Sequence, residues 1–178
     1  MRITNIKCHT QLKDKHLPQF IEKIESNESP LISKRTHSFV IIRLFPYVYT
    51  CFYKGFVNIT GITGYDVIED AIHKLSIFLD IDKSGYESAI IDCMSAHWPS
   101  KTLSSRHNLN KVIELSKADS RITGIKYNRQ RFPALFLKTK SGTVLWFSTP
   151  AISAVGLKKK QDLSIIEDII SKIICKLQ

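Results

Sequence analysis

Two segments of this sequence carry the same arrangement, and this internal repeat limits the possible folds more than any other feature. Residues 37–61 and 132–156 align without a gap at a constant shift of 95 residues. The aligned pairs include Arg43 with Lys138, Phe52 with Phe147, and Gly61 with Gly156. Few positions are identical, yet the alternation of apolar and polar residues matches throughout. Such a repeat indicates one supersecondary unit present twice, so the chain is expected to be a pseudo-dimer.

Helical segments outside this pair support the duplication. Residues 67–79, VIEDAIHKLSIFL, lie over residues 165–177, IIEDIISKIICKL, at a shift of 98. The identical positions there are Ile68/Ile166, Glu69/Glu167, Asp70/Asp168, Ile72/Ile170, Lys74/Lys172 and Leu79/Leu177. We therefore expect repeat 1 over residues 1–80 and repeat 2 over residues 81–178, which together form one domain.

Each half is predicted to run strand, helix, three strands, helix. Predicted strands are residues 2–10, 38–44, 47–53, 56–62 and 88–96, with three more within 132–157. Predicted helices are residues 12–27, 64–79, 108–117 and 163–177, with Pro18 in an early turn and Asp66 as an N-cap. Residues 27–36 are read as a polar loop. The pattern predicts an α+β fold, in which one antiparallel sheet has helices on one side and an open face on the other.

Strand alternation assigns side chains to the two faces of this sheet. If Phe52 faces outward, Thr50 and Val48 do too, while Cys51 and Tyr49 face the helices. The outward set in the other strands is Phe56, Asn58, Thr60, Thr143, Leu145, Phe147, Ala151, Ser153 and Val155, with Trp146 and Val144 inward. The open face is unusually apolar, and a large exposed apolar patch generally marks a partner site.

Charge favours an anionic partner for that face. Twenty-six Lys and Arg residues against 16 Asp and Glu give a formal net charge of +10. An excess of this size favours a polyanion such as nucleic acid, or an acidic membrane surface, although solubility alone is the other reading. No apolar run approaches the roughly 18 residues of a membrane span, and no secretory signal is evident, so an intracellular protein without a membrane partner is expected.

Motifs for catalysis and metal binding are missing from the sequence. The four cysteines are widely spaced and are interpreted as reduced core or sheet residues. There is no Gly-rich phosphate loop, nucleophile elbow or metal-ligand spacing. The repeated acidic pairs, Glu69-Asp70 and Glu167-Asp168, are interpreted as solvated helix faces. No enzymatic activity, cofactor or metal site is therefore predicted.

Taken together, these residues resemble the core domain of the TATA-box-binding protein (TBP) family, as a divergent copy from a virus, an archaeon or a divergent eukaryote. The resemblance covers nearly the whole chain. Its most specific parts are Phe132-Pro133 opening a strand, Phe147 nine residues before Gly156, and Gly156-Leu157-Lys158 ending the sheet before a helix, with Phe52 and Thr60-Gly61 as their first-repeat counterparts. The resemblance implies a saddle-shaped, curved antiparallel sheet with helices on the convex side.

The same resemblance implies that the concave face binds the minor groove of A·T-rich DNA, with phenylalanines wedged between base pairs. The minor-groove kinking of this family is an established case of the mechanism. The expected wedges are Phe132 and Phe147 in the second repeat, and Phe52 with the residue at position 37 in the first. That residue is His37, and Phe39, two positions along the same strand, is expected on the same face.

Two further groups of DNA contacts follow from the resemblance. The groove-facing group is Asn5, Lys7, Thr50, Asn58, Thr60, Ala89, Ile91, Pro133, Leu145, Ser153 and Val155. Within it, Ala89 stands at the position expected to match Asn5, Val155 at the position matching Thr60, and Lys7 where an apolar residue is usual. The phosphate-binding group is Arg43, Lys138, Lys158, Lys54 and Arg35.

Two functions remain open at this stage. The first is a general transcription initiation factor, a monomeric pseudo-dimer that bends A·T-rich promoter DNA and recruits a transcription factor IIB-like protein and RNA polymerase. It would act in the nucleus of a eukaryote, or at the site of transcription in the cytoplasm for an archaeal or viral protein. The second is a TBP-like adaptor or regulator that acts mainly through protein contacts, with weak or altered DNA binding.

Overall fold

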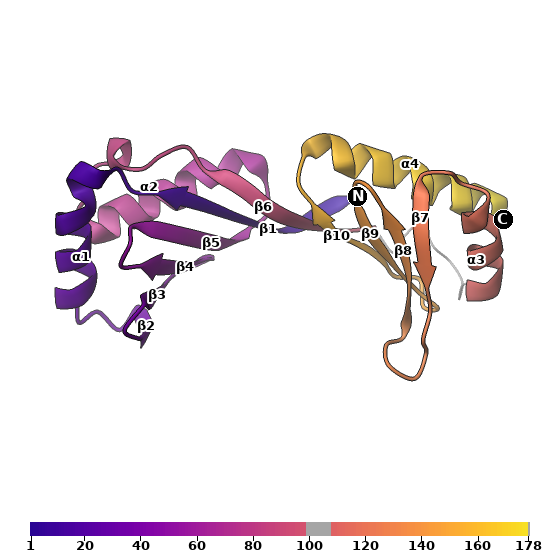
Figure 1. The fold of residues 1–178 in the computed structure, drawn as a ribbon, viewed down its shortest axis with the longest axis horizontal. Coiled ribbons are helices and arrows are strands. Elements are labelled where there is room, and N and C mark those ends of the chain that lie inside the picture. The colour runs from indigo at the N-terminus through magenta and orange to yellow at the C-terminus, as the bar shows by residue number, and fades with distance from the viewer. Residues whose placement is uncertain (99–107, 178) are drawn as a thin grey trace. The chain divides into compact units, whose positions relative to one another are not determined.

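A computed structural model describes residues 1–98 and 108–177 of the chain (Figure 1). Its strands are β1 (Arg2–Gln11), β2 (Ile32–Arg35), β3 (Phe39–Leu44), β4 (Tyr47–Phe52), β5 (Phe56–Ile62), β6 (Ile90–His97), β7 (Ile122–Lys126), β8 (Ala134–Thr139), β9 (Gly142–Phe147) and β10 (Ile152–Leu157). Its helices are α1 (Leu17–Ser26), α2 (Ile68–Leu79), α3 (Leu109–Lys117) and α4 (Lys160–Leu177), with short 3-10 turns η1 (Asp14–His16), η2 (Tyr65–Val67) and η3 (Lys83–Gly85). None of the helices in these described ranges has the length and apolar character to cross a membrane.

Two compact units make up the chain. The N-terminal unit is Asn5–Asp92, and the C-terminal unit is Met1–Thr4 with Cys93–Gln178. The first contains strands in the order β2-β3-β4-β5-β1, and the second contains strands in the order β6-β10-β9-β8-β7. Neighbouring strands within each of these orders pair antiparallel. The predicted α+β class and the repeated order of elements are confirmed.

Each unit has one strand more than the sequence pattern predicts. β2 lies within residues 27–36, where a loop was expected, and β7 was not predicted at all. Both strands are at the outer edge of their strand order. Most side chains of β2 are exposed, with only Ile32 half-buried. Edge strands of this kind lack the apolar alternation that marks a half-buried strand, because they bury little surface.

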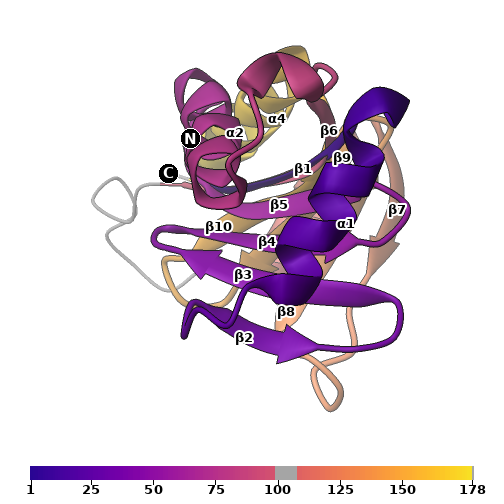
Figure 2. The same ribbon diagram turned by 90° about the vertical axis from the view of Figure 1, so that its left-hand side faces the viewer.

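Helices cover one face of the strands in each unit. Figure 2 shows the N-terminal unit, with α1 and α2 on the same side of its strands. Side chains that face these helices alternate along the strands and are fully buried, as in Tyr49 and Cys51 of β4. In the C-terminal unit Trp146 is fully buried together with Ile166, Ile169 and Ile170 of α4. The outward residues between them are half-buried, so the predicted sorting of the strand residues is confirmed.

Helix starts agree with the sequence in one case and differ in another. α1 carries Pro18 in its first turn, as predicted, although the helix begins at Leu17 and not at residue 12. The predicted N-cap Asp66 is instead part of the 3-10 turn that precedes α2, and Val67 is the N-cap without a side-chain hydrogen bond. The extra turn satisfies backbone groups locally, so no capping side chain is needed at that position.

The repeated aspartates Asp70 and Asp168 are exposed, as predicted, and each also accepts a hydrogen bond from another element of its own unit. In α2 the carboxylate of Asp70 accepts a 2.8 Å hydrogen bond from the Tyr47 hydroxyl. Burial, followed by this hydrogen bond, raises the pKa of Tyr47 to about 12. At the equivalent position of α4, Asp168 accepts a 2.6 Å hydrogen bond from Arg121. Each repeat thus uses the same aspartate with a different donor.

Gly61 and Gly156 occupy equivalent irregular positions of β5 and β10. Each lies where the register with the neighbouring first strand shifts, next to Ile62 in one unit and Leu157 in the other. Their φ angles are +88° and +76°, in the region that favours glycine. A Cβ on Gly61 would overlap the carbonyl oxygen of Pro46, whereas one on Gly156 would have no heavy atom of the described residues within 4 Å.

This difference gives a matched pair of substitutions. Gly156→Ala should cost about 1 kcal/mol, the strain of a positive φ alone. Gly61→Ala should cost more, roughly 3 kcal/mol, because the backbone carbonyl of Pro46 must also move. Urea unfolding of the two variants and the wild type measures both free energies. Equal losses would show that the Pro46 contact does not limit this position.

Candidate nucleic-acid interface

Aromatic rings form a row on the face of the N-terminal unit that the helices leave uncovered, here called its open face. Phe39 of β3 lies directly opposite Phe52 of β4, with ring centroids 5.7 Å apart. The Phe52 ring is 5.9 Å from that of Phe56 on β5. The row ends at His9 of β1, whose ring is 4.7 Å from Phe56. Four neighbouring strands therefore each contribute one ring.

A second cluster lies on the open face of the C-terminal unit. The Phe132 ring is 6.1 Å from Phe147 of β9 and 5.4 Å from Phe136 of β8. Phe132 and Pro133 precede β8 rather than opening it, since the strand begins at Ala134. The backbone amide of Phe132 donates a 3.0 Å hydrogen bond to the Asn128 carbonyl, which holds this turn. Phe132 is 40% exposed and is therefore accessible to a partner.

His37 and Phe39 are the two candidates for the ring that accompanies Phe52 in the first repeat, and they differ in position. His37 lies before β3 and is exposed. Phe39 lies within the strand, half-buried and in contact with Phe52. The aromatic partner of Phe52 is thus Phe39. From the sequence Phe56 was predicted to face outward, but it was not assigned a contact with DNA. Phe136 was not identified, although it lies two residues before Lys138 in the same strand, and strand alternation places both on the open face.

Other groove-facing candidates lie on the open faces as half-buried residues. They are Thr50, Asn58 and Thr60 in the N-terminal unit, and Leu145, Ser153 and Val155 in the C-terminal unit. Asn5 is fixed by its side-chain oxygen, which accepts a 2.9 Å hydrogen bond from the amide of Gly61. Pro133 is exposed in the turn beside Phe132, and Ile91 is a half-buried residue of β6.

Strand register corrects the predicted counterpart of Asn5. Ile6 pairs with Ile62 in the N-terminal unit, and Met94 pairs with Leu157, the counterpart of Ile62, in the C-terminal unit. The first strands therefore correspond at a shift of 88 residues. At this shift Cys93 is the residue of the second repeat that is equivalent to Asn5 in the first. Ala89, the predicted counterpart, lies outside β6. A single shift could not be read from the sequence because β1 and β6 share too few residue types.

No model of a known protein family matches the sequence, and no curated protein does either. Among solved structures, Methanococcus jannaschii TBP is similar, with a TM-score of 0.68 and 20% sequence identity. The similarity covers 97% of this chain and 97% of that chain. The fold of this chain is that of a TBP core domain. At this identity the likeness establishes the fold, and the DNA contacts rest on the residues themselves.

On the TBP-like fold the cationic candidates divide into two groups. Arg43, Lys138, Lys158 and Lys54 are exposed, which suits phosphate contacts. Arg35 instead donates from its guanidinium to the carbonyls of Ile24 and Asn27 at the end of α1. These hydrogen bonds hold the C-terminal end of the helix, so the predicted phosphate role of Arg35 is not supported. The sequence analysis missed two exposed arginines beside Phe132, Arg129 and Arg131.

The strands β1 and β6 make the open face of this TBP-like fold more polar than predicted. His9 Nδ1 lies 2.7 Å from an Asp92 carboxylate oxygen. The ammonium of Lys7 is 3.7 Å from the other oxygen of Asp92. In the C-terminal unit His97 Nδ1 lies 3.0 Å from the Ser153 hydroxyl. An ionisable cluster that includes the groove-facing candidate Lys7 therefore lies beside the aromatic row.

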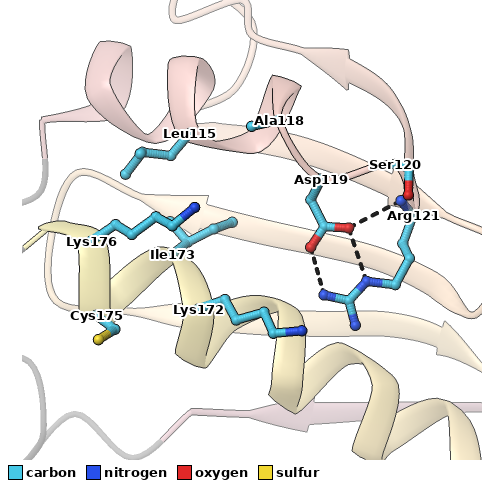
Figure 3. Close-up of a pocket in the computed structure, with 9 residues that line it drawn as sticks. All are labelled: Leu115, Ala118, Asp119, Ser120, Arg121, Lys172, Ile173, Cys175 and Lys176. Carbon is cyan, nitrogen blue, oxygen red and sulfur yellow. Dashed lines mark hydrogen bonds and ion pairs between the residues drawn. The ribbon is translucent and has the colours of Figure 1, made fainter.

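A pocket of about 570 Å³ lies on the helix side of the C-terminal unit, between α3, α4 and the start of β7 (Figure 3). Arg121 lies against the carboxylate of Asp119 there, with 2.9 Å between its Nε and an Asp119 oxygen (Figure 3). Lys172 pairs with Asp168 at 2.9 Å. Hydrogen bonds from Arg121 hold the pKa of Asp119 at about 2. A carboxyl group held ionised in this way is a poor general acid or base near neutral pH.

The Asp119–Arg121 pair should make folding stability depend on pH. Because the pKa of Asp119 is lowered in the folded state, its contribution is full above the ordinary value near 4 and is lost as pH falls toward 2. Asp119→Asn should therefore cost about 1 kcal/mol at pH 7, allowing for solvent screening, and almost nothing at pH 2.

Urea unfolding of wild type and variant at several pH values tests this expectation. Asp80→Asn is the control, since Asp80 is 85% exposed beside Lys23 and should change stability little at any pH. A loss for Asp119→Asn that stays constant down to pH 2 would contradict the assignment.

Proposed function

We propose that this chain is a TBP-like general transcription initiation factor that binds A·T-rich DNA in the minor groove and bends it, without catalysing a reaction. The supporting observation is the pair of aromatic clusters, Phe39-Phe52-Phe56 on one open face and Phe132-Phe136-Phe147 on the other. Both lie on a fold that is similar to the solved structure of Methanococcus jannaschii TBP. Partly exposed rings that already pack together can replace the base stacking lost when a base step opens.

The rest of the open face suits the minor groove of A·T pairs. Such a groove presents only hydrogen-bond acceptors. A surface of apolar residues with a few donors therefore matches it better than a surface rich in carboxylates, which can only accept. Leu145 and Val155 supply apolar surface, and Thr50, Asn58 and Thr60 supply side chains that can donate. Arg43 and Lys138, equivalent in the two repeats, would hold the phosphates on either side.

Partners in this proposal are double-stranded A·T-rich DNA, a transcription factor IIB-like protein and RNA polymerase. The chain would act as a monomeric pseudo-dimer and nucleate the preinitiation complex, in the nucleus or at another intracellular site of transcription. The hairpin tips around Phe45 and Lys140 differ between repeats, and Phe45 is 94% exposed. Unlike tips would let protein partners distinguish the two ends of the complex.

A TBP-like adaptor with weak DNA binding is the second candidate. The observation in its favour is Asp92, a carboxylate that bonds to His9 beside the aromatic row. A negative charge there opposes DNA, unless Lys7 and His9 offset it. The two candidates differ in whether the wild type binds duplex DNA at all.

Removing the second-repeat wedges tests the proposed function. Phe132→Ala with Phe147→Ala should weaken binding to a TATA-containing duplex by roughly 30-fold or more, since two base–aromatic stacks of about 1–3 kcal/mol each are lost. The same variant should lose the bend, measured as energy transfer between dyes at the duplex ends. Ile77→Ala, at a 66% exposed position of α2, is the control and should bind normally. Unchanged binding by the double variant would sink the wedge mechanism, and no binding by wild type would favour the adaptor.

Salt dependence tests the phosphate contacts separately. Binding should weaken as salt rises, and Arg43→Ala or Lys138→Ala should each reduce the slope of log K against log[salt] by about 0.9, the value for one phosphate contact. Lys117→Ala is the control, because Lys117 is an exposed residue of α3 on the helix side. Slopes that match the wild type in both test variants would exclude these two residues from the phosphate contacts.

A further inference from the structure

His9 and His97 are equivalent residues of the two repeats. His9 lies opposite Asn58 of β5, and His97 lies opposite Ser153 of β10, the residue that matches Asn58 at the repeat shift of 95. Both rings are half-buried on the open face of their own unit. The two histidines differ in what holds their Nδ1 atoms, and this difference has a chemical consequence.

The Nδ1 of His9 must carry a hydrogen. Its partner, 2.7 Å away, is an oxygen of Asp92, and an ionised carboxylate can only accept. In the neutral ring the other nitrogen, Nε2, then has a lone pair and no hydrogen. Neutral His9 consequently presents an acceptor to anything that approaches Nε2, and only the protonated ring presents a donor there.

His97 is not restricted in this way. Its Nδ1 lies 3.0 Å from the Ser153 hydroxyl, which can either donate or accept. When the hydroxyl donates, neutral His97 carries its hydrogen on Nε2. His97 can therefore offer a donor without taking up a proton.

DNA presents acceptors to both rings. Adenine N3 and thymine O2 on the floor of an A·T minor groove are acceptors, and so are the phosphate oxygens along its walls. Contact with DNA through Nε2 thus requires a proton on His9 but not on His97. Histidine is the side-chain type whose ordinary pKa lies nearest to neutral pH, so the requirement can be tested by varying pH.

We propose that His9 and His97 are both DNA contacts, and that binding is coupled to proton uptake at His9 through its bond to Asp92. This inference rests on the proposed function. Within residues 1–98 and 108–177, the charged groups at His9 are Asp92 on β6, which contacts its ring, and Lys7 on its own strand, which contacts the same carboxylate. The residues of β5 beside it, Phe56 and Asn58, do not titrate. Protonated His9 and Lys7 together outweigh the single negative charge of Asp92, which removes its repulsion of DNA.

Affinity for an A·T-rich duplex, measured by fluorescence anisotropy from pH 6 to 8 at constant ionic strength, tests the coupling. Wild-type affinity should fall three- to tenfold over this range, and by no more than about tenfold per pH unit, the limit for one proton. His9→Gln should bind with nearly the same affinity at every pH, since an amide donates without titrating. His97→Gln is the matched control at the equivalent position and should keep the wild-type slope.

Asp92→Asn supplies a test that keeps both histidines. An amide can donate to Nδ1, so neutral His9 could then carry its hydrogen on Nε2, and the pH dependence should disappear although the ring remains. Calorimetry in two buffers of different ionisation enthalpy should show proton uptake on binding for wild type and His97→Gln, and little for His9→Gln or Asp92→Asn. Thermal melting checks that each variant is folded.

The possible results distinguish a failure of the proton coupling from a failure of the proposed DNA-binding function. Binding by wild type with no pH dependence, or a wild-type slope retained in folded His9→Gln, would overturn the coupling and leave the proposed function intact. No binding to DNA at any pH would overturn the proposed function and the coupling with it. If the pH dependence of affinity were lost in His97→Gln and kept in His9→Gln, proton uptake would occur at His97, and the coupling proposed for His9 would be overturned.

Discussion

One-sided coverage of the strands is the constraint on which the rest of this structure depends. Each strand must place alternate side chains on opposite faces, and helices cover only one of them. The covered side holds fully buried residues such as Tyr49 and Trp146. The uncovered side must then be compatible with water. This explains why its aromatic residues pack against each other in clusters instead of standing singly.

The two repeats keep this plan but change the contacts that maintain it. Asp70 and Asp168 are the same residue in the same helix, yet one accepts from a tyrosine and the other from an arginine. Gly61 and Gly156 share a positive φ, and only Gly61 is also confined by a carbonyl. Backbone geometry is thus preserved where the sheet requires it, while side-chain partners vary. Such variation is consistent with a fold retained at 20% identity to a solved TBP.

The sequence was sufficient for what depends on periodicity. The eight predicted strands, the four helices and the inward or outward direction of residues such as Phe52, Cys51 and Trp146 all follow from local pattern, because burial on one side imposes it. The edge strand β2 was missed because its exposed residues carry no such pattern. Arg35 was assigned to phosphate from its position alone, and its bonds to the end of α1 depend on how helix and strand pack.

Nonlocal pairing accounts for the remaining differences at the candidate site. The His9–Asp92 contact joins residues 83 positions apart, and the counterpart of Asn5 depends on the register at which β1 and β6 meet their neighbours. Neither can be read from a local pattern. The sequence did not decide whether His37 or Phe39 is the partner of Phe52. Strand pairing decides it, because Phe39 lies opposite Phe52.

The polar cluster on the open face is costly for a DNA-binding surface unless its charges are offset. Asp92 is 30% exposed and Lys7 is 41% exposed, so both remain partly hydrated and their attraction is partly screened. Bringing a polyanion close would remove water from both and strengthen the repulsion that Asp92 exerts. The nearby groups that can offset it are the ammonium of Lys7 and a proton on His9. A carboxylate at this place is therefore compatible with DNA binding when the histidine bound to it can gain a charge.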